Sequence, residues 1–178
     1  MKRVLAGVLL SLALAAPAYA ALKAGATAPD FTLKAAKGGQ ETTFNLHEAL
    51  KKGPVVLYFF PAAFTPGCTA EAHAFAEATD DFTKLGATII GVTAGNIDQV
   101  ADFSKVECRD KFAVAADPGA KVAKEYDSIL KARPELSDRT SYVIGQDGKI
   151  AFVHSDLNPA EHVSTTMAAV KGLQAKKG

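Results

Sequence analysis

The sequence predicts an α/β domain, and three observations support this. Two apolar, partly β-branched runs, 55–60 and 87–93, are bounded by Gly or Pro and have the length of buried strands. Between them, from about Cys68 to Leu85, the large apolar residues recur at helical spacing, so the three segments form a βαβ unit with parallel strands. Near the C-terminus, two more strand-like runs flank an Asp-Gly turn and precede a final helix-like run.

The first 20 residues have the composition of an export signal. Lys2 and Arg3 precede an apolar run over 4–16, and Ala18-Tyr19-Ala20 forms a small-x-small cleavage site. The apolar run is too short to span a bilayer. We therefore expect cleavage after Ala20 and a periplasmic location, with full secretion as the open alternative. The mature chain, residues 21–178, is long enough for one domain.

The mature chain has little net charge and few cysteines. Of the 20 basic residues, Lys2 and Arg3 lie in the predicted signal, which leaves 18 against 19 acidic ones. The sequence contains no basic run, which argues against nucleic acid or an anionic membrane as the main partner. Two cysteines are too few for a disulfide scaffold but suffice for one redox pair.

A β-hairpin is expected before the βαβ unit. The segments 31–33 and 41–46 flank a turn that contains Gly38-Gly39. A short helical turn over 47–52 follows and ends at Gly53-Pro54. Gly86 is placed to end the long helix of the βαβ unit.

The second half of the chain alternates helical and extended patterns. The expected elements are a helix from Ile97 to about Arg109, a weak strand over 112–116, a helix over 120–126 started by Asp117 or Pro118, a loop over 129–137 around Pro134, a hairpin of 140–144 and 149–154, and a closing helix over 160–174. A βαβ half is thus followed by a ββα half around a mixed sheet.

Cys68 is the candidate nucleophile. Thr65 suits the N-cap and Pro66 the first helical position, so Cys68 falls in the first helical turn. Unpaired backbone N–H groups and the positive end of the helix dipole favour a thiolate there. The structural alternative is a small buried residue that happens to open a helix.

The residues around Cys68 resemble a known family. Pro61-x-x-x-Thr65-x-x-Cys68 resembles the peroxidatic motif of the peroxiredoxins, and the continuation Thr69-x-Glu71-x-x-x-Phe75 resembles their bacterioferritin-comigratory, or Q-type, branch. The family also has a distant arginine, which the segment 138–142 supplies as Arg139. The resemblance covers about 25–173 and implies a thioredoxin-like fold, with a mixed central sheet flanked by helices.

The resemblance implies a peroxidase that needs no cofactor and no metal. Cys68 would reduce hydrogen peroxide or an organic hydroperoxide and become a sulfenic acid. Thr65 would place its hydroxyl beside the sulfur, Arg139 would stabilise the thiolate and bind peroxide oxygen, and Pro61 would shield the sulfur from water. The structural alternatives are an N-cap for Thr65, a surface charge for Arg139 and a strand terminator for Pro61.

Cys108 is the candidate second redox cysteine. Many Q-type members have a resolving cysteine five residues after the first, where this chain has His73. Cys108 lies 40 residues after Cys68, among charged neighbours that suit an exposed, movable segment. We expect a Cys68–Cys108 disulfide, recycled by an external dithiol protein of thioredoxin type; the alternative is a one-cysteine enzyme resolved by an outside thiol. The resemblance also suggests a monomer or a weak homodimer.

Two other function classes remain open at this point. A thioredoxin-class thiol–disulfide oxidoreductase is disfavoured because the sequence has no C-x-x-C motif. A non-catalytic domain locked by a Cys68–Cys108 disulfide would gain roughly 4 kcal/mol from the cross-link in the chain-entropy model. Glu71 is expected to stabilise the helix start. The other histidines, His47, His154 and His162, are expected on the surface.

Overall fold

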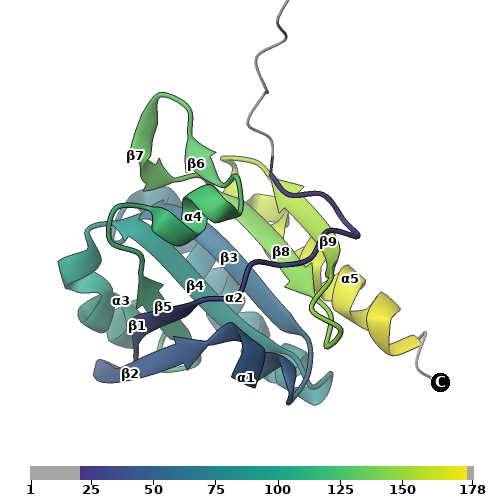
Figure 1. Cartoon of the computed structure of the whole chain (residues 1–178). Helices are drawn as coiled ribbons and strands as arrows, with labels where there is room; N and C mark the ends of the chain where they lie inside the picture. The colour runs from purple at the N-terminus through teal and green to yellow at the C-terminus, as the bar shows by residue number, and fades with distance from the viewer. Residues whose placement is uncertain (1–20, 176–178) are drawn as a thin grey trace, which may run out of the picture.

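The computed structural model describes residues 21–175, so the predicted signal peptide lies outside the described residues. A seven-stranded mixed sheet has the strand order β2-β1-β5-β4-β3-β8-β9 (Figure 1). Its strands are β1 (Thr32–Lys37), β2 (Gln40–Asn45), β3 (Val55–Ala62), β4 (Thr88–Gly95), β5 (Ala113–Ala116), β8 (Thr140–Ile144) and β9 (Ile150–Ser155). Strand β3 pairs in parallel with β4 and antiparallel with β8, which confirms the predicted βαβ unit and the mixed sheet.

Helices cover both faces of this sheet (Figure 1). They are α1 (Leu46–Leu50), α2 (Pro66–Lys84), α3 (Val100–Val106), α4 (Lys121–Glu125) and α5 (His162–Ala175), with 3-10 turns η1 (Ile97–Gln99) and η2 (Pro159–Glu161). Buried residues of α2, α3 and α5 form one apolar cluster with the sheet, and those of α1 and α4 form a second with its other face. The arrangement is the predicted thioredoxin-like one, including the N-terminal hairpin of β1 and β2.

The central strand β3 is apolar throughout because both of its faces are covered. Residues 55–60 are fully buried, and alternate side chains enter the two clusters. On the α2 side, the ring of Tyr58 stacks on that of Phe75 with 4.5 Å between centroids. A Cβ at Gly91 would lie 2.8 Å from the Tyr58 hydroxyl, so the neighbouring strand has room for glycine alone at this point.

Two predicted elements were wrong, one in its type and one in its length. Residues 129–137 form a second small sheet of β6 (Ile129–Leu130) and β7 (Arg133–Ser137) instead of a loop, and Pro134 is tolerated in that two-stranded ribbon. The helix expected over 97–109 ends at Val106. It ends there because the Cys108 N–H bonds to the Phe103 carbonyl at 3.1 Å and the next residues, Arg109 and Asp110, adopt positive φ.

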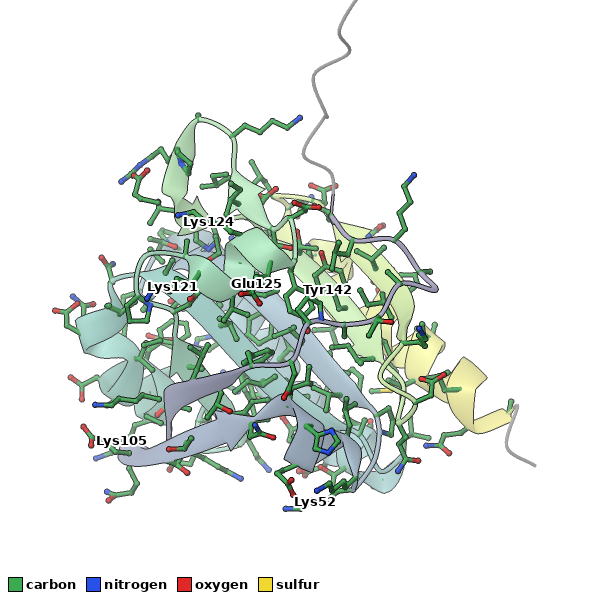
Figure 2. All side chains as sticks on the ribbon, in the orientation of Figure 1. Lys52, Lys105, Lys121, Lys124, Glu125 and Tyr142 are labelled. Atoms are coloured by element: carbon green, nitrogen blue, oxygen red, sulfur yellow. The ribbon has the colours of Figure 1, made fainter. Side chains whose placement is uncertain are left out.

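Basic side chains are spread over several elements. Figure 2 labels Lys52 after α1, Lys105 on α3, and Lys121 and Lys124 on α4, and all four are exposed. Among residues 21–175, the helices are all too short or too polar to cross a membrane.

Candidate active site

Cys68 lies where β3 passes into α2. The turn between them includes Phe64, whose φ of 61° is unusual for a residue with a side chain. Thr65 is the N-cap residue, Pro66 opens α2, and Cys68 follows in the first helical turn as predicted. The Cys68 side chain is only 1% exposed. The strand–turn–helix junction thus holds the sulfur at the positive end of a 19-residue helix.

Arg139 approaches the sulfur from a distant part of the chain. Its Nη2 lies 3.5 Å from Cys68 Sγ, although 71 positions separate the two residues in sequence. Arg139 directly precedes β8, and the pairing of Thr140 with Phe59 places it at the carboxyl end of β3. The predicted proximity of Arg139 to Cys68 is therefore confirmed, and the guanidinium is 5% exposed instead of lying on the surface.

The guanidinium of Arg139 is fixed by three hydrogen bonds. Its Nε donates to the Leu157 carbonyl at 2.8 Å, its Nη1 to Glu71 Oε2, and its Nη2 to Cys68. Gly67 leaves room for this approach, because a Cβ at that position would lie 3.0 Å from Nη2. A planar cation held at three nitrogens has a defined orientation toward the sulfur.

Glu71 belongs to this site, although its sequence position indicated only a helix-start role. It is fully buried and follows Cys68 by three residues, so both side chains lie on the same face of α2. Burial raises the pKa of Glu71 to about 8, and the adjacent Arg139 opposes that rise. Burial therefore favours the protonated carboxyl group, while the Arg139 cation favours the carboxylate. The i, i+3 spacing from Cys68 was the signal that could have placed Glu71 here.

The expectation that His162 lies on the surface was wrong. The ring is fully buried, with Nδ1 2.8 Å from Ser141 Oγ and Nε2 2.9 Å from the Asp156 carbonyl. Burial lowers the pKa of His162 to about 4. His162, Thr166 and Val170 are all buried, and their spacing marks the inner face of α5. That spacing could have revealed the burial of His162. His47 is exposed as expected, and His154 is half-buried.

Thr65 and Pro61 lie in the connection before Cys68. The Thr65 hydroxyl donates to the Ala62 carbonyl at 3.0 Å, so the side chain stabilises the turn instead of capping the helix. Pro61 does not terminate the strand, since β3 continues to Ala62. The pairing of β3 with β8 ends at Phe59, so Pro61, which has no N–H, lies beyond the last pair. The peroxidatic roles of both residues stay predictions.

The Cys108 side chain is not exposed, although its charged neighbours Arg109, Asp110 and Lys111 are, which corrects the expectation drawn from those neighbours. Its side chain is fully buried, in the same apolar cluster as Cys68 on the α2 face of the sheet. Burial raises the pKa of the Cys108 thiol well above its ordinary value, and the Glu107 carboxylate adds to the rise. Both cysteines are free thiols.

The charged residues around Cys108 instead pair with α2. The pairs are His73 with Glu107 at 2.6 Å, Glu77 with Arg109 at 3.3 Å, and Asp80 with Lys111 at 3.1 Å. The three partners on α2 are spaced by four and three residues, so they form one stripe on the helix. We call this set the ion-pair row. The exposed pairs of Glu77 with Arg109 and of Asp80 with Lys111 each stabilise the fold by only about 0–1 kcal/mol, but together with the His73–Glu107 hydrogen bond they tie the segment 107–111 to the helix that carries Cys68.

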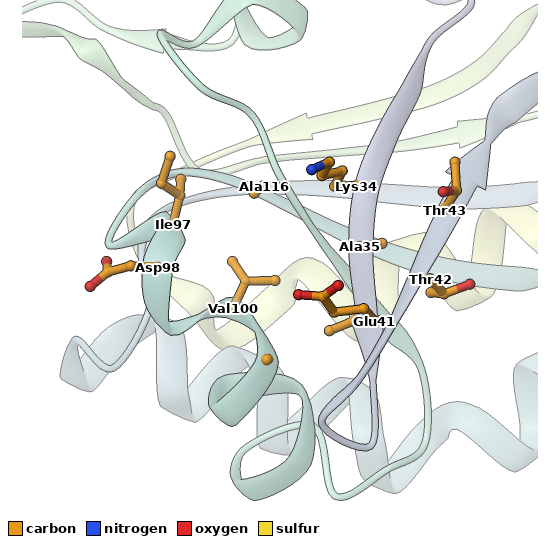
Figure 3. Close-up of a pocket in the computed structure, with 11 residues that line it drawn as sticks. Lys34, Ala35, Glu41, Thr42, Thr43, Ile97, Asp98, Val100 and Ala116 are labelled. Atoms are coloured by element: carbon orange, nitrogen blue, oxygen red, sulfur yellow. The ribbon is translucent and has the colours of Figure 1, made fainter.

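A separate hollow lies away from these residues. It has a volume of about 470 Å³ and is open between the β1–β2 hairpin and the η1–α3 segment (Figure 3). Lys34, Glu41 and Asp98 are the charged residues that line it. Neither Cys68 nor Arg139 contributes to its lining.

The arrangement at Cys68 is suited to nucleophilic attack by sulfur. The Cys68 sulfur at the helix start has a fixed guanidinium in contact, which can stabilise negative charge on the sulfur and on a leaving oxygen. Within residues 21–175, no three His, Cys, Asp or Glu side chains form a group suited to a metal ion.

Comparisons with known proteins agree with this chemistry. The family model described as the AhpC/TSA family matches residues 24–153. The chain is 31% identical over 157 residues to the chloroplastic peroxiredoxin Q of Sedum lineare, a match that spans 88% of this chain and 82% of that protein. It is 33% identical over 150 residues to the chloroplastic peroxiredoxin Q of Triticum aestivum, a match that spans 84% of this chain and 67% of that protein.

Solved structures give the same result. The crystal structure of peroxidoxin BcpB from Mycobacterium tuberculosis superposes with a TM-score of 0.75 at 30% identity, covering 85% of this chain and 97% of that one. The reduced 2-Cys peroxiredoxin of Plasmodium vivax has a TM-score of 0.76 at 22% identity, covering 86% and 98%, and supports the fold alone.

Proposed function

Because the chain belongs to the AhpC/TSA family and is a peroxiredoxin, a thiol-dependent peroxidase, we propose that it reduces hydrogen peroxide and organic hydroperoxides through Cys68. The observation that carries the proposal is the contact between Arg139 Nη2 and Cys68 Sγ at 3.5 Å. A fixed cation at that distance stabilises the thiolate and the charge that grows on the departing oxygen.

The first step is an attack of the Cys68 thiolate on one peroxide oxygen. The S–O bond forms as the O–O bond breaks, so the sulfur is oxidised to a sulfenic acid. The peroxide is reduced to water or an alcohol, and the leaving oxygen takes up a proton from solvent. Arg139 binds the peroxide oxygen, Thr65 provides a hydroxyl oxygen beside the site, and Pro61 limits the access of water.

Cys108 is the proposed resolving cysteine. Its thiol attacks the sulfenic acid of Cys68, a disulfide forms and water leaves. Support comes from the position of both side chains in one buried cluster on the same face of the sheet. Cys108 must first leave its buried position, which requires the segment 107–111 to separate from α2. The positive φ of Arg109 and Asp110 places a strained link beside the thiol that has to move.

Treatment of the reduced protein with one equivalent of hydrogen peroxide should convert both thiols to a disulfide. Mass spectrometry should show the loss of two hydrogens and a linked peptide that contains Cys68 and Cys108. The Cys108→Ser variant should instead retain a sulfenic acid and progress to sulfinic acid when more peroxide is added. A wild-type product with a stable sulfenic acid and a free Cys108 would contradict this assignment.

The full burial of Cys108 favours a specific second candidate, a one-cysteine peroxidase that an outside thiol resolves. Under that alternative, Cys108→Ser would not change the oxidised product. In either case an external dithiol protein of thioredoxin type regenerates the Cys68 thiol, and the protein acts as a monomer or a weak homodimer. The resemblance of the sequence to Q-type peroxiredoxins supports both points.

We further propose that residues 1–20 are an export signal and that the protein acts in the periplasm. The support is the basic start, the apolar run and the Ala18-Tyr19-Ala20 site. Expression of the full chain in a Gram-negative host should yield periplasmic protein whose intact mass begins at Ala21. Periplasmic material that retains Met1–Ala20 would disprove cleavage at this site.

A further inference from the structure

Behind Arg139 lies a second layer of buried ionisable groups. Glu71 uses Oε2 to accept from Arg139, while its Oε1 makes no hydrogen bond with the residues that the structure describes. That oxygen lies 3.5 Å from Nδ1 of His162. Both side chains are fully excluded from solvent. An unpaired carboxyl oxygen beside a ring nitrogen, both buried, calls for a physical explanation.

The hydrogen-bond partners of His162 define its tautomer. Nε2 faces the Asp156 carbonyl at 2.9 Å, and a carbonyl only accepts, so Nε2 carries the proton of the neutral ring. Nδ1 is then an acceptor and receives the hydroxyl proton of Ser141 at 2.8 Å. An ionised Glu71 would direct a charged oxygen at the lone pair of Nδ1. A proton on Glu71 Oε1 removes that repulsion.

We propose that the lone pair of His162 Nδ1 keeps Glu71 protonated, that this proton reserves the charge of Arg139 for the Cys68 thiolate, and that His162 is thereby a positioning residue of the peroxidase reaction. This inference rests on the proposed role of Cys68. Glu71 then carries the proton, His162 is a neutral ring, and the pair as a whole is neutral.

The charge balance explains why the proton matters to the sulfur. While the pair is neutral, the guanidinium of Arg139 has the Cys68 thiolate as its anionic partner. When the proton leaves, the Glu71 carboxylate neutralises Arg139 and the thiolate faces a cation that is already paired. At low dielectric this loss is larger than it would be in water. Thiolate stabilisation is therefore present below the pH at which the pair loses its proton, and weakens above it.

The pKa shifts of Glu71 and His162 agree with a protonated Glu71 beside a neutral His162. Burial raises the pKa of Glu71 to about 8 against the opposing charge of Arg139, and burial lowers the pKa of His162 to about 4. Both shifts favour a protonated Glu71 beside a neutral His162.

Other ionisable groups surround the pair from every packed element. They are Arg139 before β8, Cys68 on α2, His154 on β9, Asp156 after β9 and Tyr58 on β3. The His154 ring meets that of His162 edge-on at 4.6 Å, and it lowers the pKa of His162 together with Arg139, while Asp156 raises it. Burial raises the pKa of Tyr58 well above its usual range, so the phenol stays neutral.

A double-mutant cycle tests the proposal without peroxide. All variants are built on Cys108→Ser, so that Cys68 is the single thiol, and the thiolate is followed by its ultraviolet absorbance against pH, with Cys68→Ser subtracted. His162→Gln keeps a donor for Asp156 but loses the acceptor at the Nδ1 position, whereas His162→Asn keeps a polar atom there. His162→Gln should move the Cys68 ionisation midpoint up by about 1 pH unit, a tenfold change in the ionisation constant, and His162→Asn should restore at least half of it.

The decisive arm is Glu71→Gln, which imitates a permanently protonated Glu71. In that background His162→Gln should leave the midpoint unchanged, because no carboxylate remains to neutralise Arg139. An equal shift in both backgrounds, or no shift in a folded His162→Gln protein, would overturn the proposal. These measurements contain no peroxide, so they do not depend on the proposed peroxidase function. If that function were wrong, the double-mutant cycle would still give the expected shifts, but the protein would not reduce peroxide.

Nuclear magnetic resonance of the unmutated protein gives an independent result if the buried substitutions unfold it. The ¹⁵N signals of His162 should show a protonated Nε2 and an acceptor Nδ1 at neutral pH, and a change near pH 8 that Glu71→Gln abolishes. A His162 ring that is insensitive to pH between 6 and 10 would exclude a Glu71 proton held beside Nδ1.

Discussion

Replacing Cys68 with serine is expected to abolish peroxide reduction, the largest effect that any single substitution in this protein should have. A serine hydroxyl stays protonated at neutral pH and cannot serve as the nucleophile, even beside Arg139. Consumption of hydrogen peroxide by the variant should fall to the rate of the buffer alone. The substitution is nearly isosteric in a fully formed helix turn, so the thermal unfolding temperature should change little.

Cys108→Ser is the matched control, because it also leaves one cysteine in the chain. This variant should still consume one equivalent of peroxide in a single turnover. Peroxide reduction that persists in Cys68→Ser and disappears in Cys108→Ser would exchange the assigned roles of the two cysteines.

Arg139→Ala is expected to slow peroxide reduction by at least ~100-fold, the scale of one lost, positioned charge-stabilising donor. The guanidinium contacts Cys68 Sγ, and in the proposed mechanism it also binds the peroxide oxygen. Stopped-flow measurement of the second-order rate constant, from the first turnover with hydrogen peroxide, gives the effect directly. The pH at which half of Cys68 is ionised should rise in the same variant.

Arg139→Lys separates charge from geometry. Lysine restores a positive charge but cannot donate to Leu157, Glu71 and Cys68 at once, so it should recover only part of the rate. Loss of Arg139 also leaves Glu71 buried without its cation, but a protonated Glu71 avoids an unpaired charge and the fold should survive. An unaltered rate in a folded Arg139→Ala protein would show that the arginine has no catalytic role.

The predictable parts of the fold are those that depend on residues close together in the sequence. The apolar run of β3, the helical spacing of α2 and the position of Pro66 together fix the place of Cys68 without any distant contact. Arg139 is different, since its approach to Cys68 depends on the pairing of β8 with β3. The resemblance to peroxiredoxins identified it, and periodicity alone would have left it a surface charge.

The errors arose where tertiary packing decides the environment of a side chain. Charged neighbours suggested an exposed Cys108, but these charges turn outward to pair with α2 while the thiol turns into the core. The only local sign that His162 is buried is the helical spacing that it shares with Thr166 and Val170, and its polar side chain argues against burial. The strands β6 and β7 are too short for a recognisable alternation, and Pro134 with its charged neighbours favoured a loop.

The ion-pair row has a consequence for how long the oxidised protein survives. In the proposed mechanism, the sulfenic acid of Cys68 reacts after each turnover either with Cys108 or with a second peroxide molecule. The fraction of protein that is over-oxidised in each cycle depends on the ratio of those two rates. The reaction with Cys108 cannot be faster than the separation of the segment 107–111 from α2. Because dissolved ions weaken exposed pairs, the same protein would tolerate more oxidant in a salty medium than in a dilute one.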